Sequence, residues 1–396
     1  MIRRPLFSQL SVIVAIFASR NQHNSSSEMV NEIPVKLVLE DGTIFRGYSF
    51  GARRPVAGEV VFNTAMTGYP ESLTDPSYRG QILCLTYPLV GNYGTPGDDS
   101  EEDIPKFFES ASIHIEGLVV SDYSSHYSHW NATGSLGSWL NRSGVAGIYG
   151  IDTRALTRKL REKGAMPGKI IEEGDEIDFR DPNSTNLVAE VSTREKQVYG
   201  SGRYRIVMID CGVKYNIIRS LLRYDTTIIR VPWDYDYHKE SYDGLFISNG
   251  PGDPKMCDVT IGNLRRSLGY DKPVFGICLG NQLLALAAGA DTFKLKYGHR
   301  SHNQPVLKVG SDRAYITSQN HGFAVSDETL PDDWEPLFIN INDHTNEGIH
   351  HREMPFFSVQ FHPEASGGPT DTAFLFADFI SLVKESVMKR PNGAKI

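Results

Sequence analysis

Cysteine is scarce in this sequence, whose 396 residues include only Cys84, Cys211, Cys257 and Cys278. No CxxC pair occurs, which argues against a zinc site. Four cysteines in so long a chain do not make a disulfide framework, so we expect a reducing compartment. The first expectation for location is therefore the cytoplasm.

The sequence also lacks a basic excess and long hydrophobic runs. Its formal net charge of −8 argues against broad nucleic-acid binding, which needs a basic face. No apolar run approaches the roughly 20 residues that a membrane helix needs. We therefore expect neither a nucleic-acid nor a membrane partner. A hydrophobic content of 40% and a charged content of 22% are typical of a globular protein, and the length suits two domains.

Acidic residues are absent from the first 27 positions, which carry Arg3, Arg4, Arg20 and several serines. This composition fits a mitochondrial transit peptide, while the run 12–18 also resembles a weak secretory core, and a plain disordered extension is a further reading. We interpret residues 1–32 as a disordered or targeting extension. A mitochondrial location is thus the alternative to the cytoplasm.

Residues 33–190 form the first predicted domain, of mixed α/β character. The stretch VKLVLEDGTIFRGYSFG indicates two strands around the turn formers Asp41 and Gly42. Helices are expected near 134–142 and after Asp152, where a capping residue opens the segment and a glycine closes it.

The sequence pattern changes after a polar segment, 191–203, which we interpret as a linker. In residues 204–385 buried strands alternate with helices, which predicts a doubly wound, mostly parallel sheet. Ligands in such sheets bind at the carboxyl ends of the strands. Both the glycine-rich turn SNGPGDP (248–254) and Cys278 fall at predicted strand ends. Residues 386–396 are expected to be a tail.

The segment GICLG places Cys278 between a strand and a helix, in the pattern of a nucleophile elbow. A side chain at Gly276 or Gly280 would collide with neighbouring backbone in so tight a turn. The helix N-terminus favours a thiolate, and the N–H of Leu279 points toward an oxyanion. A buried core cysteine fits the same segment.

A cysteine nucleophile needs a base, and the segment FHPE offers one. Residues i and i+2 of an extended segment share a side, so His362 and Glu364 can meet. Taken alone, the same residues fit a capping histidine and a surface glutamate. The SNGPGDP turn and the segment SQNHGFAV (318–325) are likewise ambiguous alone.

Four motifs in this order, GPGDP, GICLGNQ, QNHG and FHPE, resemble the class I (triad) glutamine amidotransferases. The first domain, through residues 58–94, IDTRALTRKLREKG and the later HNQPV, resembles the small, glutaminase portion of carbamoyl-phosphate synthetase. The stretches CGVKYN and VPWD are most similar to the versions fused into animal pyrimidine-pathway polypeptides. The resemblance implies a mixed α/β small-subunit domain followed by a class I amidotransferase domain.

The resemblance also implies the roles of individual residues. Cys278 would attack the glutamine amide, His362 would be the acid/base and Glu364 its orienter. Backbone N–H groups of Gly252 and Leu279 would form the oxyanion hole. The positions that match glutamine-binding residues are Ser77, Gly250, Gly252, Leu279, Gln282, Asn320, Gly322 and Phe323. Because Ser77 lies in the first domain, the site would be completed across the domain interface.

The family passes ammonia through a tunnel to a large synthetase subunit or domain, which makes carbamoyl phosphate from bicarbonate and ATP. The chain lacks a glycine-rich loop with Lys-Ser/Thr, so ATP and Mg would belong to that partner, and no cofactor or metal is expected here. Two alternatives stay open: a non-catalytic, structural or regulatory partner of the synthetase, and another class I amidotransferase. The first domain argues against the second. The pathway, pyrimidine or arginine, is open.

One residue departs from the family pattern. Asn281 stands directly before Gln282, where the family usually has histidine. Some ammonia-using relatives also have asparagine there, but they have lost the nucleophilic cysteine that this chain keeps. Asparagine donates and accepts hydrogen bonds but does not titrate near neutral pH. We expect an active glutaminase, with glutamine affinity or the response to the synthetase open to change.

Overall fold

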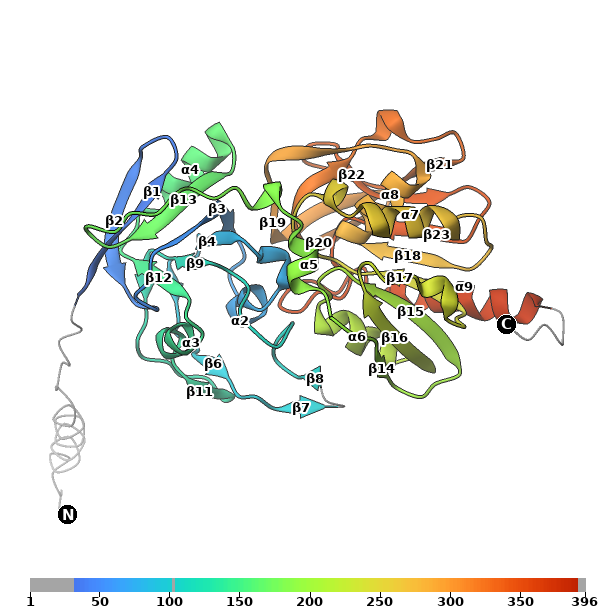
Figure 1. The fold of residues 1–396 in the computed structure, drawn as a ribbon, viewed down its shortest axis with the longest axis horizontal. Helices are drawn as coiled ribbons and strands as arrows, with labels where there is room; N and C mark the ends of the chain where they lie inside the picture. The colour runs from blue at the N-terminus through green and yellow to red at the C-terminus, as the bar shows by residue number, and fades with distance from the viewer. Residues whose placement is uncertain (1–31, 102–103, 391–396) are drawn as a thin grey trace, which may run out of the picture. The chain divides into compact units, whose positions relative to one another are not determined.

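The computed structural model describes residues 32–101 and 104–390 (Figure 1). The chain divides into two units, Met1–Ile33 and Pro34–Ile396. Nearly all of the predicted N-terminal extension lies outside the described residues. Within the described part, no helix combines the length and the apolar character needed to cross a membrane.

A closed seven-stranded barrel forms the first half of the second unit. Its strands, in barrel order, are β1 (Pro34–Leu39), β13 (Met166–Ile171), β3 (Val56–Asn63), β4 (Gln81–Leu85), β9 (Gly117–Val119), β12 (Ala146–Tyr149) and β2 (Ile44–Ser49). The predicted hairpin is confirmed, with Val38 opposite Ile44 in an antiparallel register. Parallel pairs β3–β4–β9–β12 complete the mixed architecture that the sequence predicted.

Short helices and two-stranded pieces accompany the barrel. The helices are α2 (Tyr69–Leu73), α3 (Leu136–Arg142) and α4 (Thr153–Lys163), and the pairs are β5 (Leu89–Val90) with β10 (Asp122–Tyr123), β6 (Thr95–Pro96) with β11 (Ala132–Gly134), and β7 (Ser100–Glu101) with β8 (Ile104–Pro105). The two predicted helices are α3 and α4. The side chain of Asp152 accepts a hydrogen bond from the Ala155 N–H, and Gly164 ends α4 with φ 107°.

A ten-stranded sheet forms the second half. Its order is β14 (Gln197–Tyr199), β16 (Thr226–Pro232), β15 (Tyr204–Asp210), β17 (Gly244–Ile247), β18 (Val274–Ile277), β23 (Phe356–Val359), β22 (Asn346–His351), β21 (Trp334–Asn340), β19 (Thr292–Lys308) and β20 (Ala314–Val325). The pairs from β16 to β23 are parallel, as the alternating pattern predicted. The strands from β22 to β20 extend the sheet in antiparallel pairs.

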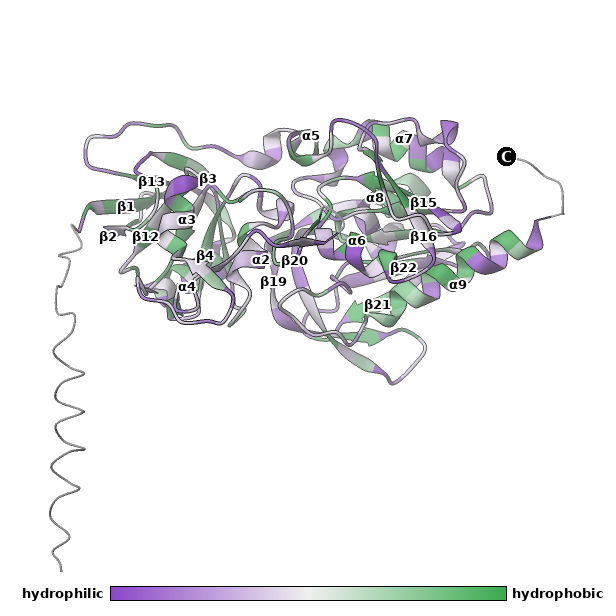
Figure 2. Ribbon diagram, turned by 90° about the horizontal axis from the view of Figure 1, so that it is seen from below, coloured by the Kyte–Doolittle hydropathy of each residue, from purple (hydrophilic) through white to green (hydrophobic). Residues whose placement is uncertain are grey.

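Helices accompany the strands of this sheet, namely α6 (Tyr215–Leu222), α7 (Asp258–Ser267), α8 (Leu279–Ala288) and α9 (Phe374–Lys389). Hydrophobic and hydrophilic turns alternate along α9 in Figure 2. Its apolar stripe, which includes Phe376, Phe379 and Val383, is buried in the same core as Phe246 and Phe275. The helix continues to Lys389, into the segment predicted as a tail.

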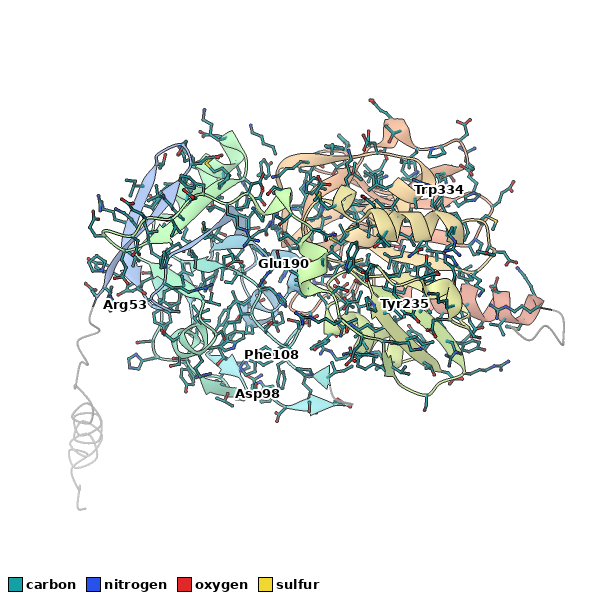
Figure 3. The ribbon with its side chains drawn as sticks, viewed as in Figure 1. Arg53, Asp98, Phe108, Glu190, Tyr235 and Trp334 are labelled. Atoms are coloured by element: carbon teal, nitrogen blue, oxygen red, sulfur yellow. The ribbon has the colours of Figure 1, made fainter. Side chains whose placement is uncertain are left out.

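The segment between the barrel and the parallel strands is tied to both. Helix α5 (Leu187–Val191) carries Glu190, labelled in Figure 3, whose carboxylate forms ion pairs of 2.9 Å with Arg79 and 3.4 Å with Arg180. The predicted linker 191–203 contains β14, which pairs antiparallel with β16. Part of that segment is thus a sheet edge.

Candidate active site

The turn at Cys278 has the strained geometry that its glycine neighbours suggested. Cys278 joins β18 to α8 with φ 55°, a left-handed value, and its side chain is buried. A Cβ added at Gly276 would lie 2.6 Å from the Gly280 carbonyl oxygen, and one at Gly280 would lie 2.3 Å from that of Ile247. The predicted collision is confirmed, since only glycine fits at either position.

His362 and Glu364 meet as the alternation predicted. Nδ1 of His362 lies 2.7 Å from Oε1 of Glu364, and both side chains are buried. Burial lowers the pKa of His362, but the adjacent carboxylate outweighs this effect and raises it to about 10. Nε2 has no hydrogen-bond partner of standard geometry among the described residues, and the Cys278 side chain is near enough to add to the rise in this pKa.

Lys214 completes this group and was not singled out as a site residue from the sequence. Its Nζ lies 2.9 Å from Oε1 of Glu364 and donates to the carbonyl oxygen of Ala365 at 3.2 Å. Burial raises the pKa of Glu364, but the Lys214 ammonium and His362 outweigh burial and lower it to about 2. The available signal was the stretch CGVKYN, in which a lysine follows a buried strand end.

The two predicted oxyanion donors are backbone groups at neighbouring strand ends. Gly252 has φ 84°, and a Cβ at Gly250 would lie 2.0 Å from the Cys211 carbonyl oxygen. Neither the Gly252 nor the Leu279 N–H has a hydrogen-bond acceptor within residues 32–101 and 104–390. The Leu279 side chain is buried in the core, and Leu279 is not among the residues that line the pocket around Cys278.

One pocket collects most of the predicted site residues. Those that line it are Ser77, Gly250, Gly252, Cys278, Gln282, Asn320, Gly322 and Phe323. The Cys278 thiol donates to the Asn320 carbonyl oxygen at 3.7 Å, and Nε2 of Gln282 donates to that of Phe323 at 2.9 Å. Residues of the barrel half, including Glu59 and Ser77, line the same pocket.

Hydrogen bonds between the barrel half and the ten-stranded-sheet half fix the Ser77 turn against the site. Nδ2 of Asn249 donates to Oγ of Ser77 at 2.9 Å. Oδ1 of Asp75 accepts from the Ser77 N–H at 2.9 Å, while its Oδ2 accepts from Nδ2 of Asn320 at 3.0 Å. Asp75 and Asn249 were not predicted, because their partners in the other half, Asn320 and Ser77, lie far away in the sequence.

Asn281 is buried, directly precedes Gln282 in the sequence, and forms hydrogen bonds with two other polar side chains. Its Oδ1 accepts from the Ser358 hydroxyl at 2.8 Å, and its Nδ2 donates to Oε1 of Gln360 at 3.1 Å. Nε2 of Gln282 donates to the same Gln360 oxygen at 3.2 Å. Asn281 therefore acts on Gln282 through Gln360 and uses one donor and one acceptor.

The fold and this pocket define a two-domain amidotransferase arrangement, and comparison with known proteins agrees. Residues 207–382 match the family described as glutamine amidotransferase class-I, and residues 37–170 match the carbamoyl-phosphate synthase small chain, CPSase domain. By its second domain the chain belongs to the class-I glutamine amidotransferases. By both domains together it belongs to the carbamoyl-phosphate synthase small-chain family.

Several curated proteins share about half of their aligned residues with this chain. It is 52% identical to the multifunctional protein URA2 of Saccharomyces cerevisiae, over 89% of this chain and 18% of that protein. It is 51% identical to the human mitochondrial carbamoyl-phosphate synthase [ammonia], over 88% and 24%. It is 52% identical to the multifunctional protein CAD of Squalus acanthias, over 88% and 16%. The chain thus spans about a fifth of the length of these relatives.

Proposed function

We propose that this chain is the glutamine-hydrolysing component of a carbamoyl-phosphate synthetase. The observation that carries the proposal is that Cys278 lines the pocket and lies near the buried His362, whose Nδ1 lies 2.7 Å from the Glu364 carboxylate. A nucleophile, a base and an orienting acid are the parts that acyl transfer needs. L-glutamine is the proposed substrate.

The reaction follows from these groups. As the Cys278 sulfur attacks the side-chain amide carbon of glutamine, its thiol proton passes to His362, and the carbonyl oxygen becomes an oxyanion that the Gly252 and Leu279 N–H groups stabilise. The C–N bond breaks as His362 gives a proton to the leaving nitrogen, which departs as ammonia. Water, losing a proton to His362, then attacks the thioester and releases glutamate and the free thiol.

The ammonia is proposed to pass through a channel to a synthetase that makes carbamoyl phosphate from bicarbonate and ATP. That synthetase, with its ATP and Mg, would be a separate subunit or another part of a longer polypeptide. The family membership of both domains and the similarity to carbamoyl-phosphate synthases support this assignment.

Labelling with a glutamine-analogue electrophile tests the proposal, because burial should keep the other thiols inert. Burial raises the pKa of Cys84 and Cys257 to about 12, and that of Cys211 well above its usual range. We expect one label per chain, lost in Cys278→Ser and kept in the matched control Cys257→Ser.

Combined with a synthetase, Cys278→Ser should lose glutamine-dependent but keep ammonia-dependent carbamoyl phosphate synthesis. Retained glutamine dependence would overturn the choice of nucleophile. A wild-type chain that takes no label and releases no glutamate, even with synthetase present, would instead support a non-catalytic partner.

A further inference from the structure

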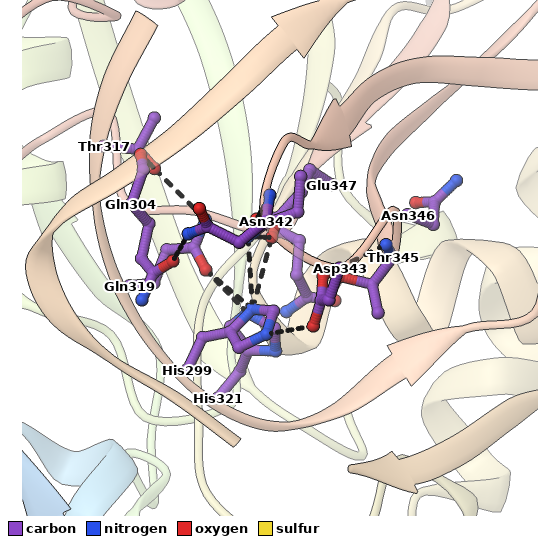
Figure 4. A network of polar contacts seen from close by, with 12 residues as sticks. His299, Gln304, Thr317, Gln319, His321, Asn342, Asp343, Thr345, Asn346 and Glu347 are labelled. Atoms are coloured by element: carbon purple, nitrogen blue, oxygen red, sulfur yellow. Dashed lines mark hydrogen bonds and ion pairs between the residues drawn. The ribbon is translucent and has the colours of Figure 1, made fainter. Parts of the chain in front are cut away.

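A second cluster of buried ligating side chains lies in the antiparallel part of the sheet, apart from the triad (Figure 4). His299, His321 and Glu347 come from β19, β20 and β22, and each offers a ligating atom within 4.8 Å of the others. Nδ1 of His299 lies 3.4 Å from Oε1 of Glu347. All three residues are buried, so their polar atoms must find partners inside the protein.

The outward nitrogen of each imidazole is already bound to an acceptor. Nε2 of His299 lies 2.8 Å from Oδ2 of Asp343, and Nδ1 of His321 lies 2.8 Å from the Phe323 carbonyl oxygen. Both outward nitrogens must therefore carry a hydrogen, which in a neutral imidazole leaves the inward nitrogen with a lone pair. A histidine that ligates a metal is held in this way, its other N–H donated to a carboxylate or a carbonyl.

The inward side holds a further acceptor, the carbonyl oxygen of Gln319. This oxygen lies 3.0 Å from Nδ1 of His299 and 3.2 Å from Nε2 of His321. The orientation of the amide is fixed, because the Thr317 hydroxyl donates to the Gln304 carbonyl oxygen and so must accept from Nε2 of Gln319. The oxygen therefore faces both imidazoles.

Acceptors exceed hydrogens at this point. Nδ2 of Asn340 donates to Oε1 of Glu347 at 2.8 Å, but the two inward imidazole nitrogens and the Gln319 oxygen face one another, and Oε2 of Glu347 is buried without a hydrogen-bond partner among the described residues. The contact between His321 and Gln319 has no hydrogen when His321 is neutral. A cation at the centre satisfies all of these groups at once.

We propose that Nδ1 of His299, Nε2 of His321, the Glu347 carboxylate and Oε1 of Gln319 bind a divalent cation of the zinc type. Imidazole and carboxylate ligands suit this class of ion. Zinc bonds of about 2.0–2.2 Å in a tetrahedron separate neighbouring ligands by roughly 3.3 Å. The separations of 3.0, 3.2 and 3.4 Å between these atoms agree with that spacing. Four protein ligands make the site a structural one.

The site would stabilise the strand that lines the pocket described above. His321 lines that pocket itself, together with its neighbours Asn320 and Gly322 on β20 and with Cys278. The bound ion would join β20 to β19 and β22 behind the pocket wall. No sequence motif indicates this site, because His299, His321 and Glu347 lie 22 and 26 positions apart and have no motif spacing.

Metal uptake by the full wild-type chain tests the proposal without any assay of glutamine hydrolysis. Chelator-treated protein is loaded with Zn²⁺ or Co²⁺, freed of excess by gel filtration, and its metal content measured. We expect one ion per chain, intense visible bands typical of tetrahedral Co²⁺, and a higher melting temperature with Zn²⁺. No retained metal, or weak octahedral bands, would overturn the proposal and leave a proton on His299 as the charge at the centre.

Variants locate the ion once the wild type has bound it. His321→Gln and Glu347→Gln should abolish the tetrahedral cobalt bands. Asp343→Asn changes the hydrogen-bond partner of His299 and of Thr345 but removes no ligand, and it should weaken zinc affinity about 10- to 100-fold. His344→Asn, at an exposed histidine of the same β21–β22 turn, is the matched control and should bind as the wild type does. Equal binding by His321→Gln and the wild type would place the ion elsewhere and overturn the assignment.

Discussion

The parallel and the antiparallel parts of the ten-stranded sheet position their polar side chains in different ways. In the parallel part, short strands alternate with helices, and Cys278 and the Gly250–Gly252 turn lie at strand ends where local motifs mark them. In the antiparallel part, β19 and β20 are long and paired with register shifts, and a buried polar network lies between strands. The reactive residues of the parallel part can be predicted from local sequence motifs. The polar contacts of the antiparallel part depend on the register in which the strands pair.

The largest expected effect is a fall in the rate of glutamine hydrolysis when the base His362 is removed. His362→Asn should lower kcat for glutamine hydrolysis by about 10²- to 10⁴-fold, because general acid–base catalysis is worth that much. Glutamate release measures it. His344→Asn in the antiparallel part should leave kcat near the wild-type value. A similar loss of kcat in both variants would contradict the difference between the two parts of the sheet.

The next effect concerns stability. Glu364→Gln leaves Lys214 as a buried, unpaired cation, and we expect the free energy of unfolding to fall by about 3–5 kcal/mol. Denaturant titration of Lys214→Met and of the double variant completes a cycle in which the double variant should recover part of the loss. An exposed pair, Arg53 with Glu172, is the control and should show little or no coupling. Additive losses for Lys214 and Glu364 would contradict the coupling.

The same group predicts a pH dependence. The pKa of Glu364 is lowered from 4.5 to about 2, so its stabilisation is complete above pH 4.5 and is lost as the pH falls toward 2. The pKa of His362 is raised from 6.5 to about 10, so its stabilisation is complete below pH 6.5 and is lost as the pH rises toward 10. The difference in unfolding free energy between wild type and Glu364→Gln should therefore be largest between pH 4.5 and 6.5. A flat difference across this range and beyond it would contradict the pairing.

A smaller effect is expected at the elbow. Gly280→Ala puts a Cβ 2.3 Å from the Ile247 carbonyl oxygen and should cost about 1–3 kcal/mol of stability. Gly262→Ala in α7, where a Cβ meets no atom within 4 Å, should instead stabilise the helix by about 0.5–1 kcal/mol. Thermal melts of the two variants should move in opposite directions.

The smallest effect concerns Asn281. Asn281→Leu leaves the Ser358 hydroxyl without its acceptor and the Gln360 oxygen with Gln282 as its remaining donor, at a cost of about 1–3 kcal/mol, and should raise KM for glutamine more than it lowers kcat. Asn281→His can restore one donor and one acceptor and should recover KM at neutral pH. An unchanged KM for glutamine in Asn281→Leu would contradict the inference that Asn281 acts on glutamine binding through Gln360 and Gln282.

Much of the fold and of the candidate site was predictable because its signals are local. Alternating apolar strands and helices gave the parallel strands, and capping residues gave α4. His362 and Glu364 could be paired because they are two positions apart on an extended segment. The barrel closure, Lys214 on Glu364, and Asp75 on Asn320 were not predicted, since each joins residues far apart in the chain.

By itself, the sequence determined which residues could react and where the chain turns. The glycines around Cys278 fix that turn wherever the segment lies, because steric exclusion acts between near neighbours. Only the tertiary structure decided that His299 lies opposite His321, through a register shift between Lys294 and His299. A slip of one residue would turn either side chain to the other face of the sheet, and no local pattern specifies that register.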